Sequence, residues 1–208
     1  MIQLPTYEVQ DKLIPQNLED ISQDQVEDHW SLYKGYVTQV NTLNKELSQL
    51  MEEGKGDSLH YADRRRRYGF EYNGMVLHEY YFGNLKAGVY EPKKGAFYNT
   101  IERFFGSYQS WKTHFENAGK TRGIGWAILY ADTTTGALAN HFIGEHQNGN
   151  VAGFAPVLVL DVWEHAYMVD HRSGGRAKYI AAFMKNINWE KVEERYSDVM
   201  AGKISKRF

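Results

Sequence analysis

The stretch Ala155–Tyr167, APVLVLDVWEHAY, joins an apolar run to two side chains that can bind a metal ion. The apolar run predicts a buried β-strand that ends directly at Asp161. His165 follows four residues later, and we expect a helix there, with both side chains on one side of a strand–helix corner. An Asp–His pair with this spacing is usually a surface pair on a helix. The preceding strand and the flanking Trp163 and Tyr167 favour a buried site instead.

The first half of the chain has the hydrophobic periodicity of two long helices. Ser22 and Gln25 fit a capping box, in which each side chain bonds to the backbone of the other residue. Apolar residues then recur at three- and four-residue intervals as far as Glu53, where a Gly-Lys-Gly-Asp turn follows. A second helical stretch covers Asp63–Phe82. Because the connection is short, we expect the two helices to pack as an antiparallel hairpin.

The second half of the chain changes to shorter elements after a loop rich in Gly, Lys and Pro, Gly83–Gly95. The predicted elements are helices Ala96–Phe105 and Tyr108–Ala118, strands Gly125–Tyr130, Ala137–Phe142 and Ala155–Leu160, and a helical segment Ala177–Met200. Helices first and strands later indicate an α+β fold. We predict an N-terminal helical hairpin domain, residues 1–90, and a C-terminal α/β domain with a three-stranded antiparallel sheet, residues 91–208.

Composition excludes several classes of protein. Hydrophobic residues make up 42% of the 208 residues, which is enough for a folded core, so the chain is not disordered. No cysteine is present, which excludes disulfides, thiolate nucleophiles, zinc fingers and iron–sulfur clusters. The formal net charge of −2 gives no general attraction to nucleic acid or an anionic membrane. Since no long apolar run or signal-like start is visible, we expect a cytoplasmic protein without nucleic-acid or membrane partners.

Without thiols, metal binding or acid–base chemistry must use His, Asp, Glu or Tyr. The chain has eight histidines, and none belongs to a His-Glu-x-x-His motif or a Glu-x-x-His pair. His29 and His78 lie on the inward stripes of the two predicted helices, where a single histidine is usually a core residue. With Asp161 and His165 they provide three imidazoles and one carboxylate, a set that suits iron or manganese as well as zinc.

The sequence DVWEHAY at Asp161–Tyr167 resembles the signature of the iron/manganese superoxide dismutases. Other segments resemble this family in the same order along nearly the whole chain: Ile21–Val40, Phe70–His78, Phe105–Tyr108, Gly123–Trp126 and Asn188–Glu190. The resemblance implies an enzyme that disproportionates superoxide to oxygen and hydrogen peroxide, with one iron or manganese ion per subunit. Its implied metal ligands are His29, His78, Asp161 and His165.

In that family a glutamine or a histidine hydrogen-bonds the metal-bound solvent. The resemblance assigns this role to His146, fifteen residues before Asp161, with Gln147 as the alternative. Gly74 stands where iron-type members place their glutamine, which supports a donor from the later segment. The alternative interpretation of His146, a solvated loop residue in a polar tract rich in Gly and Asn, stays open.

The family also has a gateway tyrosine on its first helix. Tyr36 resembles it but lies seven residues after His29, where the family has eight, so Val37 is the alternative counterpart. Tyr33 is a further candidate and stands where the family usually has a second histidine. Met168 replaces an aromatic residue that normally bonds that histidine across the dimer. These departures affect the expected substrate funnel more than the metal site.

Glu164, taken alone, is a surface charge between two candidate ligands. The resemblance implies instead that it accepts a hydrogen bond from the partner subunit's His165 across a twofold axis, in a homodimer or tetramer. Two other functions remain open on the sequence. One is a metal-binding domain of the same fold that has reduced or lost catalysis and acts as an interaction module. The other is a zinc hydrolase that uses the same four ligands.

The run Arg64–Arg67 is the one strong block of charge in the sequence. Such a run can guide an anion or contact nucleic acid. The simpler interpretation is a solvated helix face balanced by Asp63 and Glu71. With the resemblance, the aromatic residues interpreted as the apolar wall of the metal pocket are Tyr81, Trp126 and Trp163.

Overall fold

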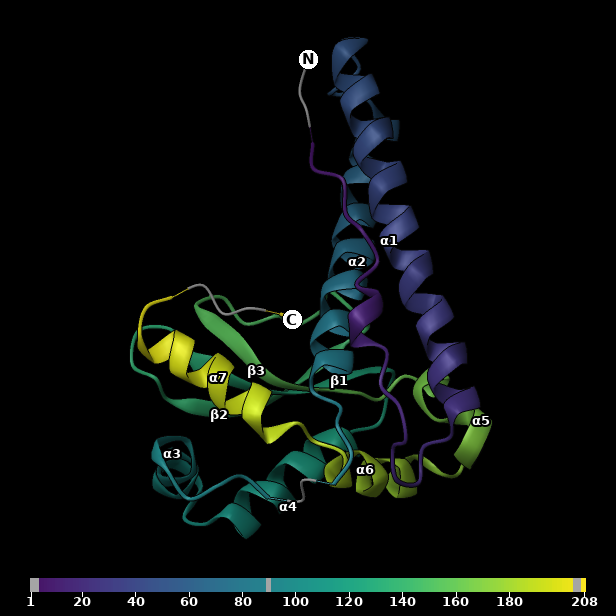
Figure 1. Cartoon of the computed structure of the whole chain (residues 1–208). Coiled ribbons are helices and arrows are strands. Elements are labelled where there is room, and N and C mark those ends of the chain that lie inside the picture. Colours follow the sequence, from purple (N-terminus) through teal and green to yellow (C-terminus); the bar gives the residue numbers. More distant parts are fainter. Residues whose placement is uncertain (1–3, 89–90, 204–206) are drawn as a thin grey trace.

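An antiparallel pair of long helices stands against the rest of the chain (Figure 1). The computed structural model describes residues 4–88, 91–203 and 207–208. Helix α1 is Gln23–Glu52 and helix α2 is Leu59–Gly83. The loop between them lies at the far end of the hairpin, and the opposite end meets the other elements (Figure 1). The predicted helical hairpin and the α+β class are therefore confirmed.

Serine side chains begin both helices of the hairpin. Ser22 Oγ accepts a hydrogen bond from the Gln25 backbone N–H at 3.1 Å, and Ser58 Oγ makes the corresponding bond in α2. Because Ser58 caps it, α2 begins four residues before the predicted Asp63. The reciprocal half of the predicted capping box is wrong. The Ser22 N–H donates to Asp170 Oδ2 at 2.7 Å, and the Gln25 side chain is engaged elsewhere.

The remaining elements are shorter. In chain order they are η1 (Asp11–Leu13, before the hairpin), α3 (Ala96–Phe105), α4 (Tyr108–Gly119), β1 (Gly125–Asp132), β2 (Leu138–Gly144), β3 (Phe154–Asp161), η2 (Glu164–Ala166), α5 (Met168–His171), α6 (Arg176–Lys185) and α7 (Trp189–Met200). The three predicted strands are confirmed, each with small shifts at its ends. No helix in the described part of the chain combines the length and the apolar character that crossing a membrane requires.

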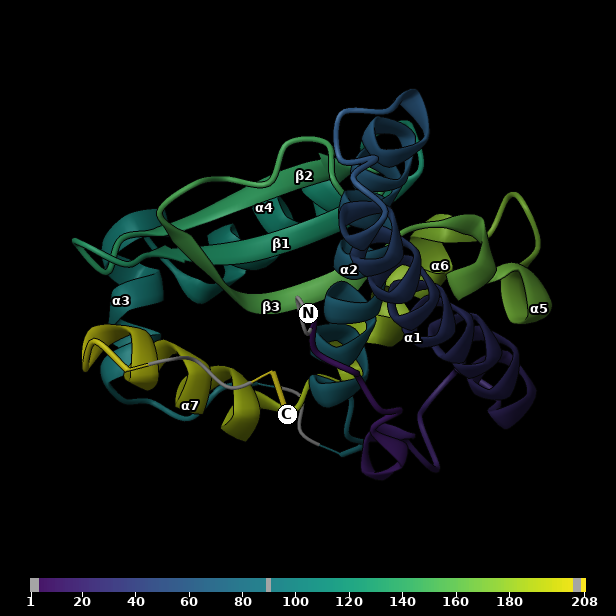
Figure 2. The same ribbon diagram turned by 90° about the horizontal axis from the view of Figure 1, so that it is seen from above.

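The three strands form one antiparallel sheet, as predicted, and their order is β2-β1-β3. The central strand β1 is buried along almost its whole length. Its register pairs Trp126 with Asp161, so the polar end of β3 lies beside an indole. Helix α4 packs against β1 and β2, whereas α2 and α7 contact β3 (Figure 2). The sheet thereby holds the end of β3 next to the hairpin.

Two predicted helices differ from the observed ones. The chain after Asp161 forms the 3₁₀ turn η2 and the single turn α5 instead of a helix that starts at once, because Trp163 is extended (φ −65°, ψ 155°). The predicted helix Ala177–Met200 is two helices, α6 and α7. The break falls at Asn186–Asn188, where the Asn188 side chain accepts a hydrogen bond from the first turn of α7.

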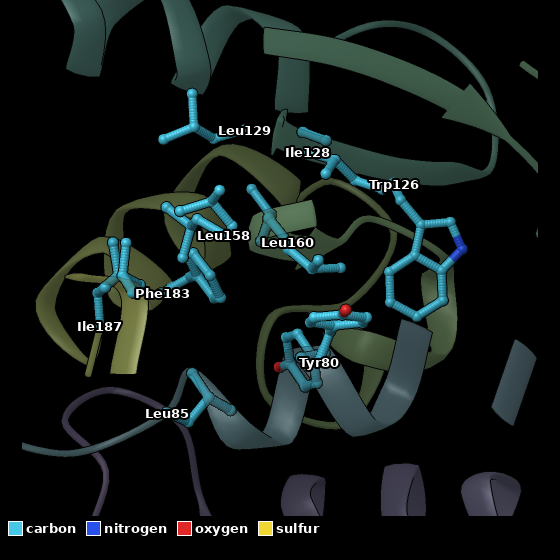
Figure 3. Packing of buried hydrophobic residues seen from close by; sticks show 14 of the residues in the cluster. Tyr80, Leu85, Trp126, Ile128, Leu129, Leu158, Leu160, Phe183 and Ile187 are labelled. Carbon is cyan, nitrogen blue, oxygen red and sulfur yellow. The ribbon is translucent and has the colours of Figure 1, made fainter. Parts of the chain in front are cut away.

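One hydrophobic cluster joins the hairpin to the sheet. Figure 3 shows Tyr80 and Leu85, from α2 and just beyond it, facing Leu158 and Leu160 of β3, with Phe183 of α6 nearby. Both predicted domains therefore contribute to the same core. The predicted boundary between residues 90 and 91 adjoins residues 89–90, which lie outside the described residues, and the division stays a prediction.

We predict that Leu160→Ala lowers the free energy of unfolding by about 3 kcal/mol, because it leaves a cavity one residue before Asp161. Leu160 is fully buried, whereas the Leu59 side chain is 91% exposed, which makes Leu59→Ala the matched control. The control should change stability by less than about 0.5 kcal/mol. Chemical denaturation followed by circular dichroism measures both variants. Equal losses would contradict the core position of Leu160.

Candidate metal centre

Three histidines and one aspartate from separate elements meet where the hairpin contacts the sheet. His29 belongs to α1, His78 to α2 and His165 to η2, and Asp161 is the last residue of β3. One nitrogen from each histidine and one carboxylate oxygen all lie within 4.8 Å of one another. The first two histidines and the aspartate are buried, and 17% of the His165 side chain is exposed. The structure thus brings together all four residues that the sequence assigned as ligands.

The Asp161 carboxylate lies at the centre of this cluster. Its Oδ2 is 3.1 Å from His29 Nε2, 3.2 Å from His165 Nε2 and 3.6 Å from His78 Nε2. Its Oδ1 accepts a hydrogen bond from the Trp163 backbone N–H at 2.8 Å. A carboxylate bonded two residues ahead forms a tight turn. That turn, rather than successive turns of an α-helix, carries His165 back towards Asp161.

The backbone determines which nitrogen of His78 faces the cluster. Its Nδ1 lies 2.6 Å from the Gly74 carbonyl oxygen, which can only accept, so Nδ1 carries the proton. Nε2 is then a bare lone pair. It is buried and makes no hydrogen bond to any residue in the described chain. A buried polar atom without a partner is destabilising, so the donor set fits a metal ion that would coordinate this nitrogen.

Burial sets the protonation states of the cluster. It lowers the pKa of His29 and of His78, so both imidazoles are neutral at pH 7. Burial by itself would raise the pKa of Asp161. The charge and hydrogen bond of His165, with a further bond from His29, outweigh burial and hold this pKa below its usual range. Neutral imidazoles and an ionised carboxylate are the forms that bind metal ions.

Gln25 fixes the turn that carries His165, a role that sequence reasoning missed. Its Nε2 donates to the His165 carbonyl oxygen at 2.7 Å, and its Oε1 accepts from the Val169 N–H at 2.9 Å. The side chain is buried on α1, one turn before His29. In the sequence, the capping-box pattern with Ser22 already accounts for a glutamine at position 25. The pattern therefore gives no sign of the contact with His165.

A polar layer made of Tyr36, Trp126 and His146 lies beside the ligands. Trp126 Nε1–H donates to His146 Nδ1 at 3.1 Å, and since an indole nitrogen only donates, the proton of the neutral imidazole is on Nε2. This Nε2 lies 2.7 Å from Tyr36 Oη and donates to it. Burial lowers the pKa of His146 to about 4, so the ring stays neutral at pH 7. His146 is thus a buried neighbour of the ligands and not a solvated loop residue.

Tyr36 reaches this layer because Gly74 leaves room for its ring. The ring centroids of Tyr36 and His78 are 5.0 Å apart. A Cβ added at Gly74 would lie 2.6 Å from a carbon of the Tyr36 ring, closer than any real contact. The adjacent Val37 lies in the hydrophobic core. Of these two residues of α1, only Tyr36 contacts His146.

Tyr33 and Gln147 are engaged elsewhere. Tyr33 Oη donates to Glu79 Oε1 at 3.2 Å and accepts from the Gln10 N–H at 3.1 Å. The Gln147 amide accepts from its neighbour's backbone N–H at 3.3 Å and donates to Glu145 at 3.2 Å. These bonds tie Tyr33 to the segment before the hairpin and Gln147 to its own loop.

Aromatic rings enclose the ligand cluster, as the sequence indicates. The ring centroids of Tyr81, Trp126 and Trp163 are 4.9 to 5.6 Å from those of ligand histidines. Two further rings were not predicted: Phe82 lies 5.0 Å from a ligand ring, and Phe70 lies 4.5 Å from the ring of His146. The sequence does not distinguish Phe82 from an ordinary core residue of the helix, because residues of both kinds recur with the same helical period.

Known proteins resemble this chain along most of its length. A family model described as "Iron/manganese superoxide dismutases, C-terminal domain" matches residues 93–195. The chain is 37% identical to the iron superoxide dismutase of Aquifex pyrophilus over 93% of its own length and 92% of the relative's. It is 37% identical to that of Aquifex aeolicus, with 91% of each chain covered, and 31% identical to manganese superoxide dismutase 2 of Haloferax volcanii, with 83% and 84% covered. With this similarity along nearly its whole length, the chain belongs to the iron/manganese superoxide dismutase family.

Proposed function

We propose that this chain is a superoxide dismutase, which converts two superoxide anions and two protons into dioxygen and hydrogen peroxide. The observation that carries the proposal is the buried Nε2 of His78, which faces Asp161 and has no hydrogen-bond partner in the described chain. The cofactor is one iron or manganese ion per subunit. The ligands that we assign to it are His29, His78, Asp161 and His165. When bound, the ion supplies a one-electron redox couple that accepts an electron from one superoxide and returns it to the next.

The ligand side chains control the charge of the site. An imidazole that binds a metal ion does so in its neutral form and adds no charge, and the ionised Asp161 adds one negative charge. The Gly74 carbonyl holds the His78 ring in the tautomer whose Nε2 faces Asp161. Gln25 holds the backbone of His165 from α1. Bonds that orient a ligand from behind strengthen metal binding and fix the ring geometry.

Tyr36 and His146 are the residues that we assign to catalysis. Tyr36 lines a pocket of about 840 Å³ that opens to solvent, and burial raises the pKa of its hydroxyl, which therefore keeps its proton at pH 7. Because His146 donates to Tyr36 Oη, the Tyr36 hydroxyl proton is available to the substrate. Peroxide formation consumes protons, so Tyr36 donates its hydroxyl proton and regains one from solvent through the open pocket. His146 orients Tyr36 and tunes the reduction potential of the ion.

Loss of one ligand should remove the metal. In His78→Gln the unpartnered nitrogen is gone, so we expect iron or manganese content after loading and dialysis to fall at least about 10-fold. His60→Gln is the control, because His60 is exposed on α2 away from the cluster. Elemental analysis of both variants gives the answer, with circular dichroism as a check on folding. Full metal occupancy in His78→Gln would refute the ligand assignment.

Loss of His146, which is not a metal ligand, should change the reduction potential and the activity but not the metal content. We expect His146→Leu to keep its metal, to shift its reduction potential and to lose about 10-fold or more of its activity. His60→Leu is the matched control, because it makes the same substitution at an exposed histidine of α2 that does not line the pocket of Tyr36. Redox titration and superoxide loss are measured on the same metal-loaded samples. Metal-loaded wild-type protein without superoxide loss would refute the enzyme proposal, and an unchanged His146→Leu would refute the assignment of His146.

We also propose a homodimer in which Glu164 accepts a hydrogen bond from the partner subunit's His165. Glu164 is exposed on η2, and the neighbouring Met168 and Val169 are 41% and 51% exposed, which gives an apolar surface beside the charge.

A cytoplasmic location stays a prediction from composition.

The dimer proposal has its own test. Glu164→Ala should raise the dimer dissociation constant at least about 10-fold, because a charge-assisted bond is lost twice across a twofold axis. Glu102→Ala removes an exposed charge from α3 and should have no effect. Analytical ultracentrifugation of all three proteins measures the constants. A monomeric wild-type protein, or a Glu164→Ala dimer of unchanged affinity, contradicts the proposed interface.

A further inference from the structure

An ion pair on α2 stands at the entrance to the polar layer. Arg67 Nε donates to Glu71 Oε1 at 2.6 Å, and Nη2 is also in contact with that oxygen. The Arg67 guanidinium lies over the Phe70 ring, 4.2 Å from its centroid. Phe70 also contacts the candidate site, since the Phe70 and His146 ring centroids are 4.5 Å apart. Phe70 therefore lies next to both the Arg67 cation and the His146 ring.

The two charges of this pair are exposed to different degrees. The Arg67 side chain is 54% exposed, whereas the Glu71 side chain is only 5% exposed. Both residues line the pocket of about 840 Å³ that also contains Tyr36 and Phe70. An anion that enters this pocket meets the guanidinium before the carboxylate. The buried carboxylate holds the guanidinium in place at the entrance.

Both charges influence the polar layer. Burial is the main cause of the raised Tyr36 pKa, to which Glu71 adds, while Arg67 acts to lower that pKa. Burial is also the main cause of the lowered His146 pKa, and Arg67 lowers it further. The pair therefore lies close enough to the site to change the energy of a charge there.

The rest of the pocket does not attract anions. Apart from Arg67 and Glu71, its walls hold two arginines and three carboxylates, a formal balance of one negative charge. Arg64 pairs with Glu46 at 2.6 Å and with Asp63 at 3.6 Å. Removal of the Arg67 charge would leave Glu71 uncompensated beneath the entrance. The local Arg67–Glu71 pair, more than the overall charge, decides what an anion meets there.

We propose that the Arg67–Glu71 pair sets the affinity of the site for small anions, with Arg67 admitting them past Phe70 and Glu71 opposing them. Where the anion is superoxide, this role of the pair rests on the proposed function. Where it is another small anion that binds a metal ion, the role does not depend on the proposed function. Arg67 is then a specificity-determining residue that favours anionic over neutral diatomic ligands.

Removing either charge of the pair should change anion affinity in the opposite direction. This difference distinguishes an electrostatic role of the pair from a structural one. With azide as the probe on iron-loaded protein, Arg67→Gln should weaken binding by about 2- to 10-fold, and Glu71→Gln should strengthen it by a similar factor. The double variant should return close to wild type, because both charges are gone. If the pair were only structural, both single variants would weaken binding.

Two controls sharpen the experiment. Arg65→Gln removes the same charge from the same run, but Arg65 packs over Tyr68 and does not line this pocket, so azide binding should stay unchanged. Nitric oxide is a neutral diatomic ligand, and its binding should be equal in all variants. Optical titration measures both ligands at two ionic strengths, and the differences between variants should shrink as salt increases.

The outcomes separate this proposal from the proposed function. Weaker azide binding in Glu71→Gln, or equal effects of Arg65→Gln and Arg67→Gln, overturns the role of the pair even if the protein removes superoxide. The expected azide pattern in a protein that does not remove superoxide supports the pair and refutes only the dismutase. Where superoxide is removed, its second-order rate constant should follow the azide affinities across the variants.

Discussion

An ionised carboxylate buried at the end of a strand is the constraint on which this protein's site depends. Asp161 is fully buried, and an isolated charge in that position would be strongly destabilising. The Trp163 N–H bonds one carboxylate oxygen, and the nearest imidazole nitrogens, of His29 and His165, lie within 3.2 Å of the other. These groups come from α1, from η2 and from the link between β3 and η2. Docking the hairpin onto the sheet therefore also compensates the charge, and a bound cation would complete the compensation.

Gly74 links the metal ligands to the polar layer. Its carbonyl oxygen bonds His78 Nδ1 and so turns Nε2 towards Asp161. Its missing side chain leaves the space that the Tyr36 ring occupies against His78. Any larger residue would displace Tyr36 and with it the bond to His146. A glycine inside a helix is unfavourable by about 1 kcal/mol relative to alanine. The close approach of two rings and a carbonyl accounts for its presence here.

Polarity changes in steps from the pocket to the ligands. Arg67 is half exposed, Phe70 is apolar, and the neutral Tyr36–His146–Trp126 chain follows before the buried charge of Asp161. The hydrogen bonds among Trp126, His146 and Tyr36 fix the orientation of the donors along this path. Such a preorganised arrangement strengthens electrostatic effects, because the local dielectric is low. The same arrangement explains why the few charges beside it matter more than those on the outer surface.

The sequence by itself determined the hairpin and the three strands, because these follow from local periodicity. It also supplied the set of candidate ligands, through the resemblance of several of its segments to the superoxide dismutase family. The tertiary structure decided which residues meet. Tyr36 and His146 are 110 residues apart, and Gln25 and His165 are 140 apart, so no local pattern contains either contact. Hydrogen bonds of this kind depend on how whole elements pack, and the tautomer of His146 depends in turn on Trp126. The sequence gives the chemical type of each side chain, but the packing of the folded chain decides which side chains it contacts.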